Sequence, residues 1–179
     1  MYAPSIGIDD VISALIAFLQ PFVGNASGGT VTPNVPTPII RGQANRVPPP
    51  VPAFVVVTEI HRANLDTPVF INSADPNIQQ ATVTNSKQID IQIDFYGVDS
   101  ANWSAAVETV FRSPYAPDQF PTGMAPLFCS DAQQAPLITG EEQYENRWVL
   151  TASLEYNPDV TVPQQSATEL RTTIFEDLP

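Results

Sequence analysis

The chain has 179 residues, of which 43% are hydrophobic and 15% are charged, and this length and composition suit one folded domain with a buried core. Its 19 acidic residues outnumber its 7 basic residues and give a net charge of −12, so it lacks the continuous basic face that binding to a phosphate backbone requires. The single cysteine, Cys129, excludes an internal disulfide and a zinc site built from several cysteines.

The first element expected from the sequence is an amphipathic helix over residues 8–23. Apolar residues recur there at spacings of three and four, and Asp9 and Asp10 lie in the first turn, where the helix dipole favours carboxylates. The opposite face, which includes Ala17 and Phe18, is also apolar, so the helix is expected either to be deeply packed or to contact a partner. Phe18 is therefore a candidate interface residue. The apolar run is too short to cross a bilayer, and the residues before it lack the basic start of a secretory signal.

Two loops rich in proline are expected next, at residues 24–38 and 47–53. Prolines number 19 in the chain, about twice the usual share, and each one fixes φ and removes a backbone donor. The second loop directly precedes the apolar strand that begins at Phe54. An interdomain linker and a ligand for another protein's groove are alternatives, but the strand and helix patterns on both sides favour a rigid exposed loop. The candidate assembly contacts in and beside this loop are Arg46, Pro48, Pro49 and Pro50.

Alternating and continuous apolar patterns predict several strands. They are expected at residues 39–40, 54–60, 67–71, 88–96, 127–129, 137–139, 143–156 and 168–175. The segment 88–96 has the clearest alternation, which predicts a half-exposed antiparallel strand. Its buried set is Ile89, Ile91, Ile93 and Phe95, and its exposed set is Gln88, Asp90, Gln92 and Asp94.

A second helix is expected from Asp99 or Ser100 to about Arg112, with an inner stripe of apolar residues. Together, the predicted helices and strands indicate an α+β fold over residues 1–179. We expect a single domain with a mostly antiparallel sheet of about five to seven strands. Two main helices should cover one face of this sheet.

The search for catalytic chemistry is mostly negative. The sequence has no phosphate-binding glycine loop and no nucleophile turn. His61 is the one histidine, and Glu59 is expected on the same strand face, an arrangement more typical of a surface pair than of a catalytic one. Tyr144, Trp148 and Tyr156 share a strand face and are better explained by core packing than by carbohydrate stacking. We therefore expect no enzyme, no metal site and no cofactor.

Several blocks of the sequence resemble the neck (tail) terminator proteins of tailed bacteriophages. Together with the opening helix, these blocks cover nearly the whole chain in order, while the loop 24–38 is longer than is usual in that family. The motifs Asn-Arg-Val-Pro and Val-Thr-Val-Pro-Gln-Gln are the most specific. The blocks are residues 41–50 leading into 54–58, then 89–97, 102–112, 142–148 and 157–165.

This resemblance implies a structural role without catalysis or a cofactor. Such proteins form a ring, commonly of six subunits, that stops growth of the tail tube and joins the tail to the neck of the capsid. The expected partners are copies of the same chain, the tail tube protein and head–tail adaptor or neck proteins, with the sheath protein as a further candidate. Genomic DNA would pass through the lumen without specific binding. The protein would be part of the virion tail or neck, assembled in the host cytoplasm and without a membrane partner.

The acidic composition agrees with that role, because an acidic lumen repels phosphates and lets DNA slide. Asp90 and Asp94 are the candidate lumen residues. A ring of identical subunits also needs two complementary surfaces on each chain. The alternatives left open are another head–tail connector, a head-completion protein or a baseplate protein and, less favoured, a carbohydrate-binding module.

Overall fold

The alternation of isoleucine with polar residues produces the central strand of the main sheet. The structure, a computed structural model, describes residues 3–23, 37–42, 53–75, 79–135, 137–138 and 144–164. The central strand of the main sheet is β5 (Lys87–Tyr96), which pairs antiparallel with β2 on one side and with β10 on the other. The six-stranded sheet runs in the order β1-β2-β5-β10-β6, with β7 also paired to β10. Its other strands are β1 (Ile39–Arg41), β2 (Phe54–Asn64), β6 (Met124–Cys129), β7 (Gln133–Gln134) and β10 (Arg147–Tyr156).

The two faces of this sheet differ in polarity as the sequence predicts. On one face, the apolar residues of β5 are fully buried beside those of β10, with Ile91 opposite Ala152 and Ile93 opposite Leu150. On the other face lie the polar residues Gln88 to Asp94 of β5 and, from β10, Thr151 and Ser153. The apolar face therefore forms the core, where each fully buried aliphatic side chain contributes about 1.5–3 kcal/mol.

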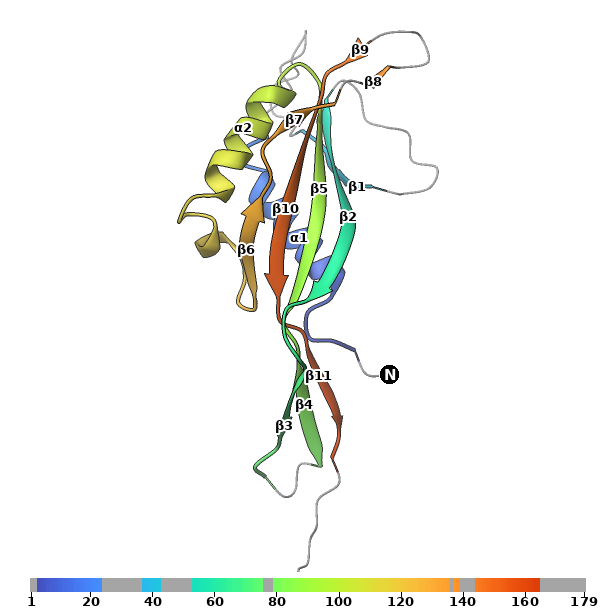
Figure 1. The fold of residues 1–179 in the computed structure, drawn as a ribbon, viewed down its shortest axis with the longest axis vertical. Helices are drawn as coiled ribbons and strands as arrows, with labels where there is room; N and C mark the ends of the chain where they lie inside the picture. The colour runs from blue at the N-terminus through green and yellow to red at the C-terminus, as the bar shows by residue number, and fades with distance from the viewer. Residues whose placement is uncertain are drawn as a thin grey trace, which may run out of the picture.

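Both helices pack on the apolar face, which confirms the predicted α+β arrangement. Figure 1 shows α1 (Ile8–Leu19) behind the sheet and α2 (Ser100–Phe111) beside β6 and β7. Helix α1 is shorter than expected, because its last helical hydrogen bond comes from the Gln20 N–H to Ile16 and Pro21 has no N–H to continue the ladder. The chain after it stays in the core, where Val23 is fully buried.

A second, three-stranded sheet projects from one end of the main sheet, and we call it the arm. It consists of β3 (Val69–Asn72), β4 (Gln80–Thr84) and β11 (Asp159–Pro163) in the order β11-β4-β3. Figure 1 shows the arm extending away from both helices at the lower end of the molecule. The sequence predicted only β3, so β4 and β11 were missed.

The remaining elements are short. They are the 3-10 turn η1 (Pro117–Gln119) and the two-stranded pair β8 (Leu137–Ile138) and β9 (Tyr144–Glu145). The strand expected from residue 143 is thus divided into β9 and the longer β10. The strand expected at 168–175 and most of the two proline-rich loops lie outside the described residues. Within the described ranges, no helix is long and apolar enough to cross a membrane.

Candidate assembly site

The structure separates the pair that the sequence placed on one strand face. An irregularity in the pairing of β2 with β5 puts Glu59 opposite Ile91 and His61 opposite Asp90, on different faces of the sheet. Glu59 instead forms an ion pair with Arg62, and His61 is exposed. The predicted Glu59–His61 surface pair is therefore wrong. Among the described residues, no cluster of histidine, cysteine and acidic side chains is suited to hold a metal ion.

The helix-free face of the main sheet carries the two predicted acidic residues, and their environments differ. Asp94 is only 4% exposed, and its Oδ1 accepts hydrogen bonds from Nε and Nη2 of Arg147 at 3.1 and 2.8 Å. Asp90 is half-buried and accepts hydrogen bonds from the Ser153 hydroxyl at 2.6 Å and from the Gln88 amide at 2.8 Å. The expected exposure of Asp94 is therefore wrong, because its contacts with Arg147 bury and neutralise it within the subunit. Asp90 has no ion pair in the described part of the chain.

An aromatic cluster holds the first residue of β2 in place. The rings of Phe54 and Tyr96 stack with their centroids 4.5 Å apart, and the Arg147 guanidinium lies 5.7 Å from the centre of the Tyr96 ring. Burial raises the pKa of Tyr96, and the nearby positive charge of Arg147 opposes that shift. The cluster fixes the point at which the chain enters the sheet after the proline-rich segment.

The arm has one apolar face that no helix of the described chain covers. Its pairing register places Phe70, Val83 and Val160 side by side across the three strands, with Val162 of β11 on the same face. The opposite face carries Val69 and Ile71 of β3 together with threonines of β4 and β11. Phe70 is 55% exposed at the outer edge of the sheet. An exposed apolar face of this kind is typical of a contact surface.

A hollow lined by aromatic rings lies at the C-terminal end of α1. Its volume is about 230 Å³, and the lining residues are Ala17, Phe18, Pro21, Phe22, Tyr115 and Gln119. Phe18 forms its floor, at 4% exposure, and contacts the rings of Phe22, Phe111 and Phe120. Of the two expectations for this face of α1, deep packing holds for Phe18, because this aromatic cluster buries its ring in the core.

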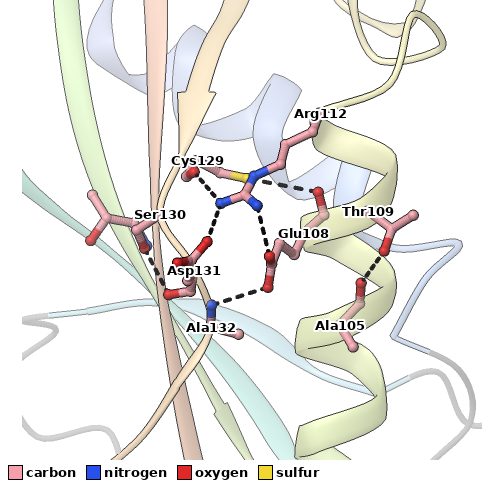
Figure 2. Close-up of polar contacts among 9 residues, drawn as sticks. Ala105, Glu108, Thr109, Arg112, Cys129, Ser130, Asp131 and Ala132 are labelled. Carbon is pink, nitrogen blue, oxygen red and sulfur yellow. Dashed lines mark hydrogen bonds and ion pairs between the residues drawn. The ribbon is translucent and has the colours of Figure 1, made fainter.

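A polar network joins the end of α2 to the segment between β6 and β7, as Figure 2 shows. Arg112 donates hydrogen bonds to Glu108, to Asp131 and to the carbonyl of Cys129 at distances of 2.9, 2.7 and 2.9 Å. Glu108 in turn accepts a hydrogen bond from the backbone N–H of Ala132 at 3.1 Å. The hydrogen bond to Asp131 raises the pKa of Arg112 further above its ordinary value. The network holds the edge of the main sheet against α2.

A comparison with models of known protein families identifies the family of this chain. The model of the family described as phage neck terminator protein matches residues 9–177, a range that includes the main sheet, the arm, α2 and all of α1 after its first residue. The chain belongs to the phage neck terminator family. A search among curated proteins finds no match. Membership gives this neck terminator chain a structural role in the tail or neck of a bacteriophage particle.

The structure describes some of the site residues that the sequence predicted in this neck terminator chain, and others lie outside the described ranges. Asp90 and Asp94 do share one sheet face, although their position relative to a channel stays a prediction. Arg46, Pro48, Pro49 and Pro50 lie outside the described residues, so their role also stays a prediction. The alternation of Val160 with Val162, in a segment where no strand was expected, was the signal that could have revealed β11 of the arm.

Proposed function

We propose that this neck terminator protein forms a ring, of about six subunits, that caps the tail tube and joins the tail to the head. Family membership over residues 9–177 carries this proposal. The partners would be further copies of the chain, the tail tube protein and a head–tail adaptor or neck protein, with the sheath protein as a further candidate. The protein would act by binding and shape and would catalyse no reaction.

The shape of the subunit supports assembly into a closed ring. A cyclic assembly of identical chains uses heterologous contacts, in which one surface of a subunit meets a different surface of the next. The arm projects from the body and presents an apolar face at one end of the molecule. A projecting element of this kind is suited to reach a neighbouring subunit without any change in the core.

The charge of the chain supports passage of DNA without specific binding. The net charge of −12 would repel a phosphate backbone from the lumen of a ring. We propose that the helix-free face of the main sheet borders this lumen, with Asp90 among the acidic residues that contribute there. Asp94 contributes less, because Arg147 neutralises it.

The test of this function combines a mass measurement with a location in the particle. Light scattering and electron microscopy of the purified protein should show a ring with a mass of about six times the 19.4 kDa of one chain. Immunogold labelling of purified virions should place the protein where the tail meets the head. Labelling at the baseplate would contradict the proposal and favour the alternative of another morphogenesis protein.

A further inference from the structure

In the described part of the chain, the arm is a thin sheet with no helix packed on its apolar face. In the described residues, its strands β3, β4 and β11 bury few large side chains, and all four residues of β3 are exposed. Small sheets with an open apolar face are only marginally stable in water and gain stability when another element packs on that face. Phe70 is the largest side chain on this face. The arm therefore presents an aromatic side chain that can enter a hollow lined by other aromatic rings.

The aromatic hollow at the end of α1 is chemically suited to receive such a side chain. The hollow is open to solvent and has a volume of about 230 Å³. This volume is large enough for a phenyl ring, because an enclosed cavity of roughly 150 Å³ binds benzene. The rings of Phe22 and Tyr115 meet edge to face at 6.5 Å on its wall. A third ring can add further edge-to-face or offset contacts there. None of the described residues that line the hollow is charged.

The arm and the hollow lie at opposite ends of α1, so one chain cannot join them. The segment before α1 is tied to the base of the arm, because the Ser5 N–H donates to the carbonyl of Asp159 at 2.8 Å and the Asp159 N–H donates to the Ser5 hydroxyl at 2.9 Å. The other end of α1 reaches α2, where Phe18 contacts Phe111. A helix of 12 residues separates these points by about 18 Å. Contact between the two surfaces therefore requires a second copy of the chain.

Charge also favours these surfaces as the contact between copies. Two chains that each carry −12 repel one another, and the repulsion is weakest where uncharged surfaces meet. The apolar face of the arm, with Phe70, Val83, Val160 and Val162, contains no charged side chain. The same holds for the residues of the hollow.

We propose that Phe70 on the arm of one subunit inserts into the hollow beside Phe18, Phe22 and Tyr115 of the next subunit. This inference rests on the proposed ring and names the contact that closes it. The contact joins two different surfaces, so repeating it from chain to chain produces a ring when the rotation closes. Phe70 acts as the buried aromatic anchor of the interface.

The first test compares Phe70→Asp with Ile71→Asp. Both residues are 55% exposed on β3 but point to opposite faces of the arm. The two substitutions therefore add the same negative charge to the same strand, on different faces. Phe70→Asp should weaken association at least about tenfold, since it removes an aromatic anchor and places a carboxylate against aromatic rings. Ile71→Asp should leave the association constant near the wild-type value. Equal effects of the two variants, measured by light scattering across concentration, would overturn the inference.

The second test addresses the hollow. Ala17→Trp should fill it and block association to a similar extent, whereas Ser13→Trp, one turn earlier on the exposed stripe of α1, should not. Far-UV circular dichroism and the thermal midpoint confirm that each variant is folded. Association of Ala17→Trp at wild-type strength would assign the contact to another surface.

Chemical cross-linking separates this inference from the proposed ring. The double variant Phe70→Cys/Ala17→Cys, treated with a short bis-maleimide at high protein concentration, should give a ladder of oligomers, and Ile71→Cys/Ala17→Cys should not. The native Cys129 is fully buried and gives little background. A wild-type ring without a ladder overturns the arm contact and leaves the ring intact. A ladder without a closed ring supports the contact and contradicts the ring, and the absence of both contradicts both.

Discussion

Arg147 donates two hydrogen bonds to one carboxylate oxygen of Asp94, across the central pair of strands β5 and β10. The Asp94 side chain is 6% exposed and that of Arg147 is 25% exposed, and the Gln92 amide also donates to the same carboxylate. The pair is therefore a structural element of the helix-free face. Arg147 compensates the negative charge of Asp94, which the sequence alone predicts to be exposed.

The first prediction concerns this ion pair. Arg147→Ala should lower the free energy of unfolding by about 1–3 kcal/mol, because it leaves the Asp94 carboxylate buried without its charged partner. Urea denaturation at neutral pH measures the change. The double variant Arg147→Met/Asp94→Leu is the control and should recover most of the loss, since two apolar residues leave no unpaired charge. A double variant no more stable than Arg147→Ala would show that the loss comes from packing.

The second prediction concerns Phe18. Because its ring is 4% exposed and contacts three other rings, Phe18→Ala should lower the free energy of unfolding by about 3–5 kcal/mol. Tyr115→Ala is the matched control, because Tyr115 belongs to the same aromatic cluster but is 49% exposed, and it should cost less than about 1.5 kcal/mol. Comparable losses in urea denaturation would contradict the assignment of Phe18 to the core.

The third prediction concerns the network around Arg112. Arg112→Ala removes the hydrogen bonds that hold Cys129 and Asp131 against α2, so the segment after β6 should open more often. Cys129, whose pKa is raised by burial, should then react faster with a thiol reagent, and the Ala132 amide should exchange its hydrogen faster. Arg41→Ala removes only an ion pair with Asp9 on the surface and should leave both rates unchanged. Identical labelling rates in the two variants would show that the network does not protect Cys129.

The main sheet could be predicted from the sequence because its strands alternate strongly. In β5 the alternation of isoleucine with polar residues specifies both the strand and its buried face, and the structure confirms both. The extra residue around Ile60 could not be predicted, because it moves the His61 side chain to the other face of the sheet and leaves no signal in the amino-acid pattern of β2. For Phe18, the surplus of apolar residues on α1 left deep packing and a partner contact equally open, and only the positions of Phe111 and Phe120 decide between them.

The arm was missed because its strands are short and lie far apart in the chain. Val83 and Val160 become neighbours only through the pairing of β4 with β11, and no local pattern reports a pairing of that kind. The apolar run at Val69 to Ile71 predicted a strand but not that the strand would be exposed on an edge. The aromatic hollow likewise depends on contact between α1 and the turn that holds Tyr115.

The last prediction concerns alkaline pH. Burial raises the pKa of Tyr156 above its ordinary value of 10.0, although the positive charge of Arg62 opposes the shift, and burial also raises the pKa of Cys129 above its ordinary value of 9.0. A group whose pKa is raised by folding is neutral in the folded state where it is ionised in the unfolded state. Its contribution to stability is complete below the unfolded pKa and is lost as the pH rises through the folded pKa. The free energy of unfolding should therefore fall as the pH rises from about 9 to about 11.

Tyr156→Phe isolates the tyrosine part of this loss. It removes the ionisable hydroxyl and also the hydrogen bond with Arg62, so it should be less stable than the wild type at neutral pH by an offset of about 1 kcal/mol. Above pH 10 the difference should shrink, by at most about 1.4 kcal/mol for each pH unit, because the variant has no proton to lose at that position. Urea denaturation at a series of pH values measures both curves. Parallel curves would show that Tyr156 ionises equally in the folded and unfolded chains, against its burial at 4% exposure beside the end of β6.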